Sequence, residues 1–287
     1  MELAGDARRG GFADLVTTEY PDVRLSDTTL APATREQLER VLHEQRQRDL
    51  LESRGFAPLH RLLLTGPAGT GKSMTASALA NELSLPLVTI RIDALVSKYT
   101  GETVAKLRVI FDAMARPRTV YLFDDFFDEF GAIGAWQMVG SDIVDARRIL
   151  TMFLSFLDDT QPESLIVAVT DHRSLLDDAL LRRFDTVIPF AQPDSAQALN
   201  LLRHRLDAMN TFAVSWNEIA DHVKGLSQAR LVRAAESAAK RAILDDGGSL
   251  STDVLITALG EHRRIHHMTG FSIDMSLGNR FENDLDG

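Results

Sequence analysis

Residues 66–73 read Gly66-Pro67-Ala68-Gly69-Thr70-Gly71-Lys72-Ser73, a complete G-x-x-x-x-G-K-S pattern. It follows the apolar run 62–64, and a helical pattern begins at Met74; a phosphate-binding loop requires this order of strand, loop and helix. The glycines of such a loop let backbone N–H groups surround a polyphosphate, and the next helix turns its positive dipole end toward it. We expect Lys72 to contact the outer phosphates and Ser73 to help coordinate Mg²⁺. Residues 66–74 therefore predict a site for a nucleotide and its Mg²⁺.

The overall composition is that of a globular protein with 287 residues, 45% of them hydrophobic, a net charge of −10 and no cysteine. The length allows one large domain or two smaller ones. The acidic charge disfavours binding to nucleic-acid phosphates, so we expect no nucleic-acid partner. The absence of cysteine excludes disulfides and thiolate metal sites. Because neither a signal-peptide segment nor a membrane span is found in the sequence, we expect a cytoplasmic protein without a membrane partner.

Five short apolar runs alternate with helical patterns along the first two thirds of the chain. They lie at 59–65, 85–92, 119–123, 165–170 and 186–190. Several of these runs are almost continuously apolar, as is typical of strands buried on both faces. The pattern predicts an α/β fold in which a five-stranded parallel sheet is flanked by helices.

The two ends of the chain differ in character from this region. Residues 1–33 lack sustained periodicity, and Thr34 with Gln37 has the spacing of a capping box, which predicts a helix from 34 to about 55. After 193, three helical segments follow without a further strand, and Asp194 with Gln197 suits the start of the first. We expect four parts: a flexible arm (1–33), a large nucleotide-binding domain (34–192), a small helical lid (193–265) and a flexible tail (266–287).

Two pairs of acids follow the third predicted strand. Hydrolysis of ATP at a phosphate loop needs one acid for the Mg²⁺ shell and a residue that aligns or activates water. Asp124 and Asp125 come directly after the strand, so we assign Asp124 to magnesium and Asp125 to water. Asp128 and Glu129 are the alternative pair. Using them would carry Asp124 and Asp125 into a buried strand, where unpaired carboxylates are costly, so the first pair is preferred.

These motifs, in this order, resemble the AAA ATPases of the AAA+ superfamily, in the branch with katanin and spastin. The chain is also similar to prokaryotic AAA ATPases encoded beside subtilisin-like proteases. The resemblance covers about residues 34–265. It implies a P-loop NTPase fold, ATP and Mg²⁺ bound between the sheet domain and the helical lid, and a ring of six identical subunits. It also implies a protein substrate and adds a subtilisin-like protease as an expected partner.

The segment Ser97-Lys98-Tyr99-Thr100-Gly101-Glu102 resembles the aromatic pore loop of this family. The resemblance implies that Tyr99, with Lys98 beside it, grips a polypeptide in the central pore, and that Thr100 and Gly101 complete the loop. An aromatic ring suits this role because it contacts any side chain or backbone. An ordinary loop tyrosine is the alternative, and the order of the motifs favours the pore loop.

Three features depart from the family pattern. Asp171 follows the fourth predicted strand where the family has asparagine, and Asp125 stands where glutamate is usual. Four extra residues separate Asp125 from the segment 130–134. An ionised aspartate only accepts hydrogen bonds and repels phosphate, and the shorter acid changes a geometry that tolerates little misplacement. These departures predict that nucleotide binding is retained, and they leave open whether hydrolysis is fast.

Two further segments with arginines resemble parts of the family's nucleotide site. The segment 180–185 resembles the arginine-finger segment, so Arg183, or as second choice Arg182, would reach the γ-phosphate of a neighbouring subunit. A surface pair of arginines is the alternative. Arg230 in the lid either mimics a sensor arginine or faces water. His266 and His267 are read as a solvated pair, because no third metal ligand accompanies them.

The sequence supports one leading function and one main alternative. The leading hypothesis is an ATP hydrolase that remodels or threads a protein substrate as a ring oligomer. The alternative, motivated by Asp125, Asp171 and the four extra residues, is an ATP-gated assembly or regulatory switch with slow or no hydrolysis. A nucleic-acid remodeller is a third reading, which the acidic charge disfavours.

Overall fold

The computed structural model describes residues 11–115, 117–130, 141–159, 163–172, 176, 178–245 and 247–269, without the side chains of 141–143 and 265–269. The chain divides into two compact units between Gln192 and Pro193. Among the residues that the structure describes, no helix has the length and apolarity needed to span a membrane.

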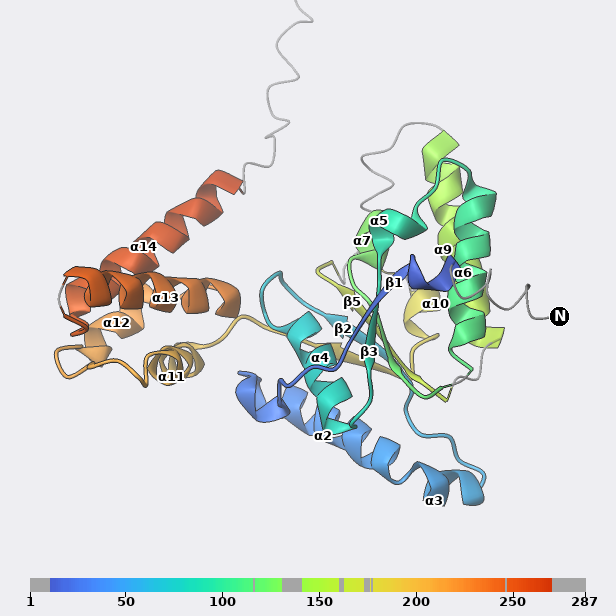
Figure 1. Ribbon diagram of the computed structural model, residues 1–287, viewed down its shortest axis with the longest axis horizontal. Coiled ribbons are helices and arrows are strands. Elements are labelled where there is room, and N and C mark those ends of the chain that lie inside the picture. The colour runs from blue at the N-terminus through green and yellow to red at the C-terminus, as the bar shows by residue number, and fades with distance from the viewer. Residues whose placement is uncertain are drawn as a thin grey trace, which may run out of the picture. The chain divides into compact units, whose positions relative to one another are not determined.

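A sheet of six strands forms the centre of the first unit over its described residues (Figure 1). The spatial order is β1 (Val16–Glu19), β3 (Leu87–Ile90), β4 (Val120–Phe123), β5 (Leu165–Thr170), β2 (Arg61–Thr65) and β6 (Thr186–Pro189). Strands β2 to β6 pair in parallel, and β1 runs antiparallel to β3. The five parallel strands agree with the sequence prediction. All residues of β4 and β5 are buried, which explains their continuous apolar runs.

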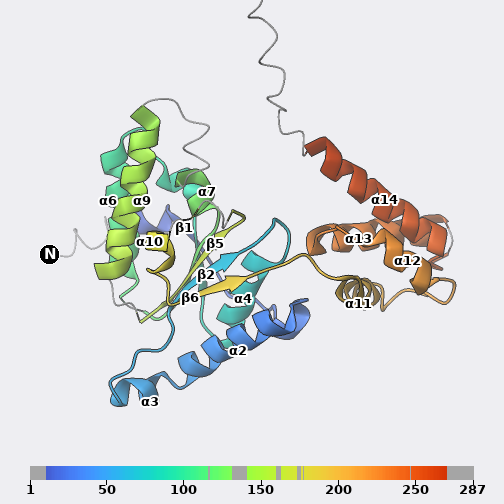
Figure 2. The same cartoon turned by 180° about the vertical axis from the view of Figure 1, so that it is seen from behind.

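Helices cover both faces of this sheet. On one face lie α2 (Pro32–Arg46) and α4 (Lys72–Glu82), and on the other α6 (Thr100–Ala113) and α9 (Ser141–Asp159), as the two opposite views show (Figures 1 and 2). Strand β2 serves both cores, because Leu63 packs on one side and Leu62 and Leu64 on the other. Each fully buried leucine of this kind stabilises the fold by about 1.5–3 kcal/mol. The shorter helices are α3 (Arg48–Ser53), α5 (Ile92–Leu95), α7 (Phe126–Phe130), α10 (Asp178–Leu181) and the 3₁₀ turn η1 (Leu25–Asp27).

The predicted flexible arm (1–33) is ordered structure over its described residues, 11–33. Strand β1 adds a sixth, antiparallel strand to the sheet, so the expectation of five parallel strands needs this correction. The side-chain amide of Asn81 on α4 donates to the carbonyl of Val23 at 2.9 Å, and Leu25 is buried. Of the four residues of β1 only Val16 is buried, so an edge strand this short leaves little periodicity in the sequence.

The helix predicted from 34 to about 55 is two helices, α2 and α3, and it begins earlier. Pro32 occupies the first turn of α2, a position that suits proline because its missing N–H would have no partner there. The Thr34 hydroxyl donates instead to the carbonyl of Pro189 at 2.9 Å. The capping-box prediction for Thr34 and Gln37 was therefore wrong.

The second unit consists, in its described part, of four helices. These are α11 (Ser195–Arg205), α12 (Trp216–His222), α13 (Gln228–Asp245) and α14 (Thr252–Thr269). The predicted capping box is present, since the Gln197 backbone N–H donates to Asp194 at 2.8 Å and the Asp194 N–H to the Gln197 side chain at 3.1 Å. Helix α12 was missed because it has seven residues and only Ile219 is buried.

Candidate nucleotide site

The glycine-rich loop joins the end of β2 to the start of α4. Gly66 has φ +145°, and a Cβ there would lie 2.1 Å from the carbonyl oxygen of Phe190. No other residue fits this approach without displacing backbone. Gly71 precedes α4 with φ 92°, in the left-handed region that glycine adopts without strain. The loop geometry thus depends on glycine at the positions that the motif requires.

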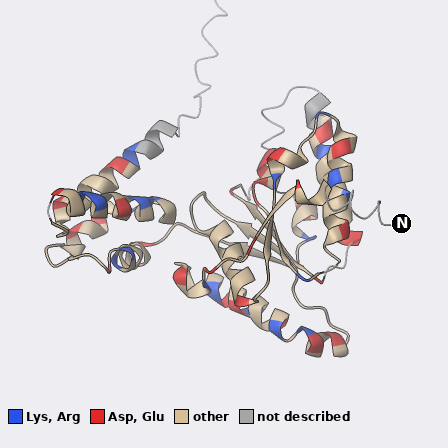
Figure 3. Cartoon of the chain, in the orientation of Figure 1, with Lys and Arg blue, Asp and Glu red and all other residues tan. Residues whose placement is uncertain are grey.

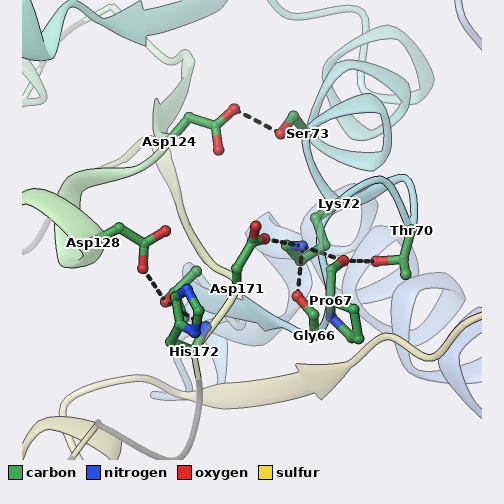
Figure 4. Close-up of polar contacts among 10 residues, drawn as sticks. Gly66, Pro67, Thr70, Lys72, Ser73, Asp124, Asp128, Asp171 and His172 are labelled. Carbon is green, nitrogen blue, oxygen red and sulfur yellow. Dashed lines mark hydrogen bonds and ion pairs between the residues drawn. The ribbon is translucent and has the colours of Figure 1, made fainter. Parts of the chain in front are cut away.

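Lys72 lies beneath this loop with its side chain only 4% exposed. Its ammonium group donates to the carbonyls of Gly66 at 2.7 Å and Pro67 at 3.0 Å and to Asp171 Oδ1 at 2.6 Å (Figure 4). Asp171 follows the last residue of β5, and its side chain is 30% exposed. The predicted phosphate-binding lysine therefore forms an ion pair with the acid at the predicted sensor position.

Ser73 and Asp124 meet across the gap between α4 and the end of β4. The Ser73 hydroxyl donates to Asp124 Oδ2 at 2.6 Å (Figure 4). Hydroxyl and carboxylate oxygens are ligands that Mg²⁺ takes, and Mg²⁺ commonly binds one or two protein groups together with substrate phosphates. Within the described residues, no group of three or more acidic or histidine side chains could hold a metal by itself. The pair fits a Mg²⁺ ion that a nucleotide brings with it.

Asp125 occupies the turn between β4 and α7 with a positive φ of 58°, a conformation uncommon for residues other than glycine. Its side chain is exposed beside other acids. Although part of its surface is exposed, the carboxyl group loses some of its hydration to the neighbouring protein, which raises the pKa of Asp125 above its ordinary value; the charges of Asp124, Asp128 and Asp171 raise it further, while Lys72 opposes them. A carboxylate with a raised pKa is a stronger proton acceptor, as a general base requires.

The alternative acids lie on α7, whose acidic residues are visible in Figure 3. Asp128 accepts a hydrogen bond from the Thr170 hydroxyl at 3.0 Å, and the same hydroxyl accepts one from the His172 backbone N–H at 3.1 Å. Strand β4 ends at Phe123, so Asp124 and Asp125 lie outside the buried strand. Sequence reasoning missed the contact of Asp128 with Thr170; the one available signal was a polar residue ending the apolar run 165–170.

The predicted arginine fingers lie just after α10. The guanidinium of Arg183 forms an ion pair with Asp158 on α9, whereas the side chain of Arg182 is exposed. In the described part of the chain, neither arginine forms a hydrogen bond or ion pair with Lys72 or Asp124.

Of the predicted pore loop, Lys98 and Tyr99 lie between α5 and α6, whereas Thr100 and Gly101 belong to the first turn of α6 and are not loop residues. Tyr99 precedes α6 and is 63% exposed, and the Lys98 ammonium lies 5.9 Å from the centre of its ring. The Ser97 backbone N–H donates to the Thr103 hydroxyl at 3.1 Å, and the Lys106 ammonium donates to Ser97 Oγ at 2.6 Å. The loop therefore presents an aromatic and a cationic side chain from an anchored base.

The remaining predicted residues lie in the second unit or outside the described residues. Arg230 donates to the carbonyl of His262 at 3.4 Å within the second unit. The side chains of His266 and His267 and the segment 131–134 lie outside the described residues.

A glycine-rich loop between a parallel strand and a helix, with its lysine and serine facing acids at the ends of two neighbouring strands, defines the class of P-loop nucleotide-binding proteins. Residues 62–192 match the family described as "ATPase family associated with various cellular activities (AAA)". The chain belongs to this AAA family, since it is also 32% identical, over 81% of its length, to an uncharacterized AAA family ATPase, y4kL, of Sinorhizobium fredii.

Further comparisons agree with this assignment. A proteasome-activating nucleotidase of Methanopyrus kandleri is 30% identical over 87% of this chain. The chain spans 69% of the Sinorhizobium relative and 61% of the Methanopyrus one. The crystal structure of the FIGL-1 AAA domain shares the fold, with a TM-score of 0.66, 21% identity and coverage of 91% of this chain and 89% of that one. AAA proteins generally bind ATP with Mg²⁺ and hydrolyse it, and they typically form rings that act on protein substrates.

Proposed function

We propose that this protein couples ATP hydrolysis to remodelling or threading of a protein substrate as a ring of identical subunits. The observation that carries the proposal is the pairing of Ser73 with Asp124 at 2.6 Å beside the buried Lys72. Residues at the adjoining ends of β2, β4 and β5 would thus bind the phosphates, hold the metal and orient the attacking water. A ring of six and a subtilisin-like protease partner come from the sequence resemblance.

Each residue of the site would have a distinct task. The loop N–H groups and Lys72 would bind the phosphates, and Ser73 with Asp124 would hold Mg²⁺, which supplies charge neutralisation to the transferred phosphoryl group. Asp125 would orient the attacking water and accept its proton, a role that its raised pKa supports. Catalysis would consist of positioning and electrostatic stabilisation rather than covalent chemistry.

Exposed residues would serve the contacts with substrate and neighbour. Tyr99 and Lys98 present an aromatic ring and a charge to a polypeptide. For the arginine finger, exposure favours Arg182, because Arg183 is held by Asp158 on its own subunit. This reverses the order of preference drawn from the sequence.

A switch with slow hydrolysis is the second candidate function. The specific observation in its favour is the ion pair between Lys72 and Asp171, which occupies the phosphate-binding lysine. In that case ATP would control assembly or the binding of a partner, and little turnover would follow.

Steady-state ATP turnover across a series of protein concentrations tests the proposal, with Lys72→Ala as the blank. The ring model predicts that specific activity rises cooperatively with concentration, because a finger from one subunit completes the site of the next. A rate equal to the blank, measured while ATP is bound, would support the switch instead. Absence of nucleotide binding would contradict both functions.

A further inference from the structure

The ammonium group of Lys72 has no donor left for a nucleotide. It carries three N–H groups, and three acceptors lie within 3.0 Å in the described structure: the carbonyls of Gly66 and Pro67 and the carboxylate of Asp171. The two carbonyls belong to the loop itself. Asp171 is the one charged partner of Lys72 among them, so binding of a phosphate to Lys72 has to displace or share this contact.

Asp171 can be replaced by a phosphate as the partner of Lys72. Its side chain is 30% exposed, whereas that of Lys72 is 4% exposed, so Asp171 can exchange its contact for water and Lys72 cannot. Asp124 and Asp128 stand at the same edge of the sheet, at the end of β4 and on α7 (Figure 4). Asp171 pairs with Lys72, whereas Asp124 accepts from Ser73 and Asp128 from Thr170.

We propose that Asp171 is a specificity-determining residue, which competes with the terminal phosphate of a nucleoside triphosphate for Lys72 and so weakens triphosphate binding relative to diphosphate binding. The inference rests on the proposed function, in that residues 66–73 bind ATP. An aspartate cannot donate a hydrogen bond to phosphate, and its charge repels the extra charge of a γ-phosphate. A diphosphate carries less charge, so the carboxylate of Asp171 repels it less.

The test compares the Kd of ADP with that of the slowly hydrolysed analogue ATPγS, both with Mg²⁺, by calorimetry on the full chain. Asp171→Asn keeps the shape of the side chain and removes its charge. We expect it to improve the binding of ATPγS over that of ADP by about tenfold. Asp128→Asn is the matched control, because it removes a carboxylate at the same edge that contacts Thr170 rather than Lys72. It should leave the ratio of the two Kd values unchanged.

Three further measurements support the test, and the first two do not depend on the folding of Asp171→Asn. Asp171→Glu retains the charge and should keep the wild-type ratio of Kd values. The wild-type protein itself should bind ATPγS no more tightly than ADP. Without nucleotide, the unfolding midpoint of Asp171→Asn should fall, because Lys72 stays buried without its counter-ion, and ATPγS should restore it.

The outcomes separate the inference from the function on which it rests. An unchanged ratio in Asp171→Asn, an equal gain in Asp128→Asn, or a wild type that strongly prefers ATPγS would overturn the role of Asp171 and leave the nucleotide site intact. A wild-type protein that binds neither nucleotide would overturn the proposed function, and this inference with it.

Discussion

At the scale of single residues, the site depends on a close backbone contact at Gly66 that leaves no room for a side chain. The absent side chain of Gly66 lets the phosphate loop pass against Phe190 at the end of β6. The contact joins the loop to the edge strand of the sheet, because the Phe190 N–H donates to the carbonyl of Thr65 at 2.6 Å. The packing of the phosphate loop against the backbone of Phe190 therefore helps to set the shape of the loop.

We expect Gly66→Ala to abolish nucleotide binding and to destabilise the fold by several kcal/mol, since the added Cβ would lie 2.1 Å from a backbone oxygen and φ is unfavourable for alanine. Calorimetry with ATPγS and urea unfolding measure the two effects. Gly260→Ala on α14 is the control, because nothing lies within 4 Å of a Cβ there. It should be neutral or stabilising by up to about 1 kcal/mol. Normal binding by Gly66→Ala would contradict this account of the loop.

At the scale of elements, helix α6 holds the loop that precedes it. Besides Ser97, Lys106 binds the carbonyl of Ala94 at 2.8 Å, so one side chain links α6 to the end of α5 and to the base of the predicted pore loop. We therefore predict that Lys106 acts through the loop rather than on a substrate, as a positioning residue for Tyr99.

Lys106→Met should reduce processing of a protein substrate severalfold and leave ATP binding unchanged, because it releases the loop while keeping the aliphatic stem. Fluorescence of an unfolding reporter protein measures processing, and calorimetry measures ATP binding. Lys106→Arg should recover part of the activity. Arg108→Met on the same helix is the control, since Arg108 pairs with Asp112 and does not contact the loop. Equal loss in both methionine variants would refute a specific positioning role.

At the scale of the whole molecule, the exposed Arg182 gives the reason to expect an assembly. A guanidinium that reaches the phosphates of another subunit makes catalysis depend on the ring. Arg183 is tied to Asp158 on α9, a partly exposed ion pair worth at most about 1 kcal/mol.

Arg182→Ala should lose ATP turnover, and mixing it with Lys72→Ala should restore part of the activity, because mixed rings pair an intact loop with an intact finger. Turnover of the mixture against the two separate variants measures this. Asp158→Asn is informative as well, since it frees Arg183 and should leave turnover near the wild-type level. Failure of the mixture to recover would argue against a finger acting between subunits.

Much of the candidate site could be predicted from the sequence because its parts are local. The G-x-x-x-x-G-K-S pattern lies within eight residues, and Asp124 and Asp171 directly follow apolar strands. Parallel strands end at one edge of a sheet, so acids at their ends could be expected to lie near the loop. The Asp194 cap was readable for the same reason, since its partner is three residues away.

The remaining features depend on contacts between distant segments. The edge strand β1 forms because β3, some seventy residues away, offers it a partner; the Thr34 hydroxyl binds Pro189 instead of capping a helix. In the same way, the ion pairs of Lys72 with Asp171 and of Asp158 with Arg183 could not be predicted from the local sequence. The sequence by itself determined the class of fold, the phosphate loop and its acids. Tertiary structure decided which of these charges neutralise one another, because ion pairs depend on distance in space.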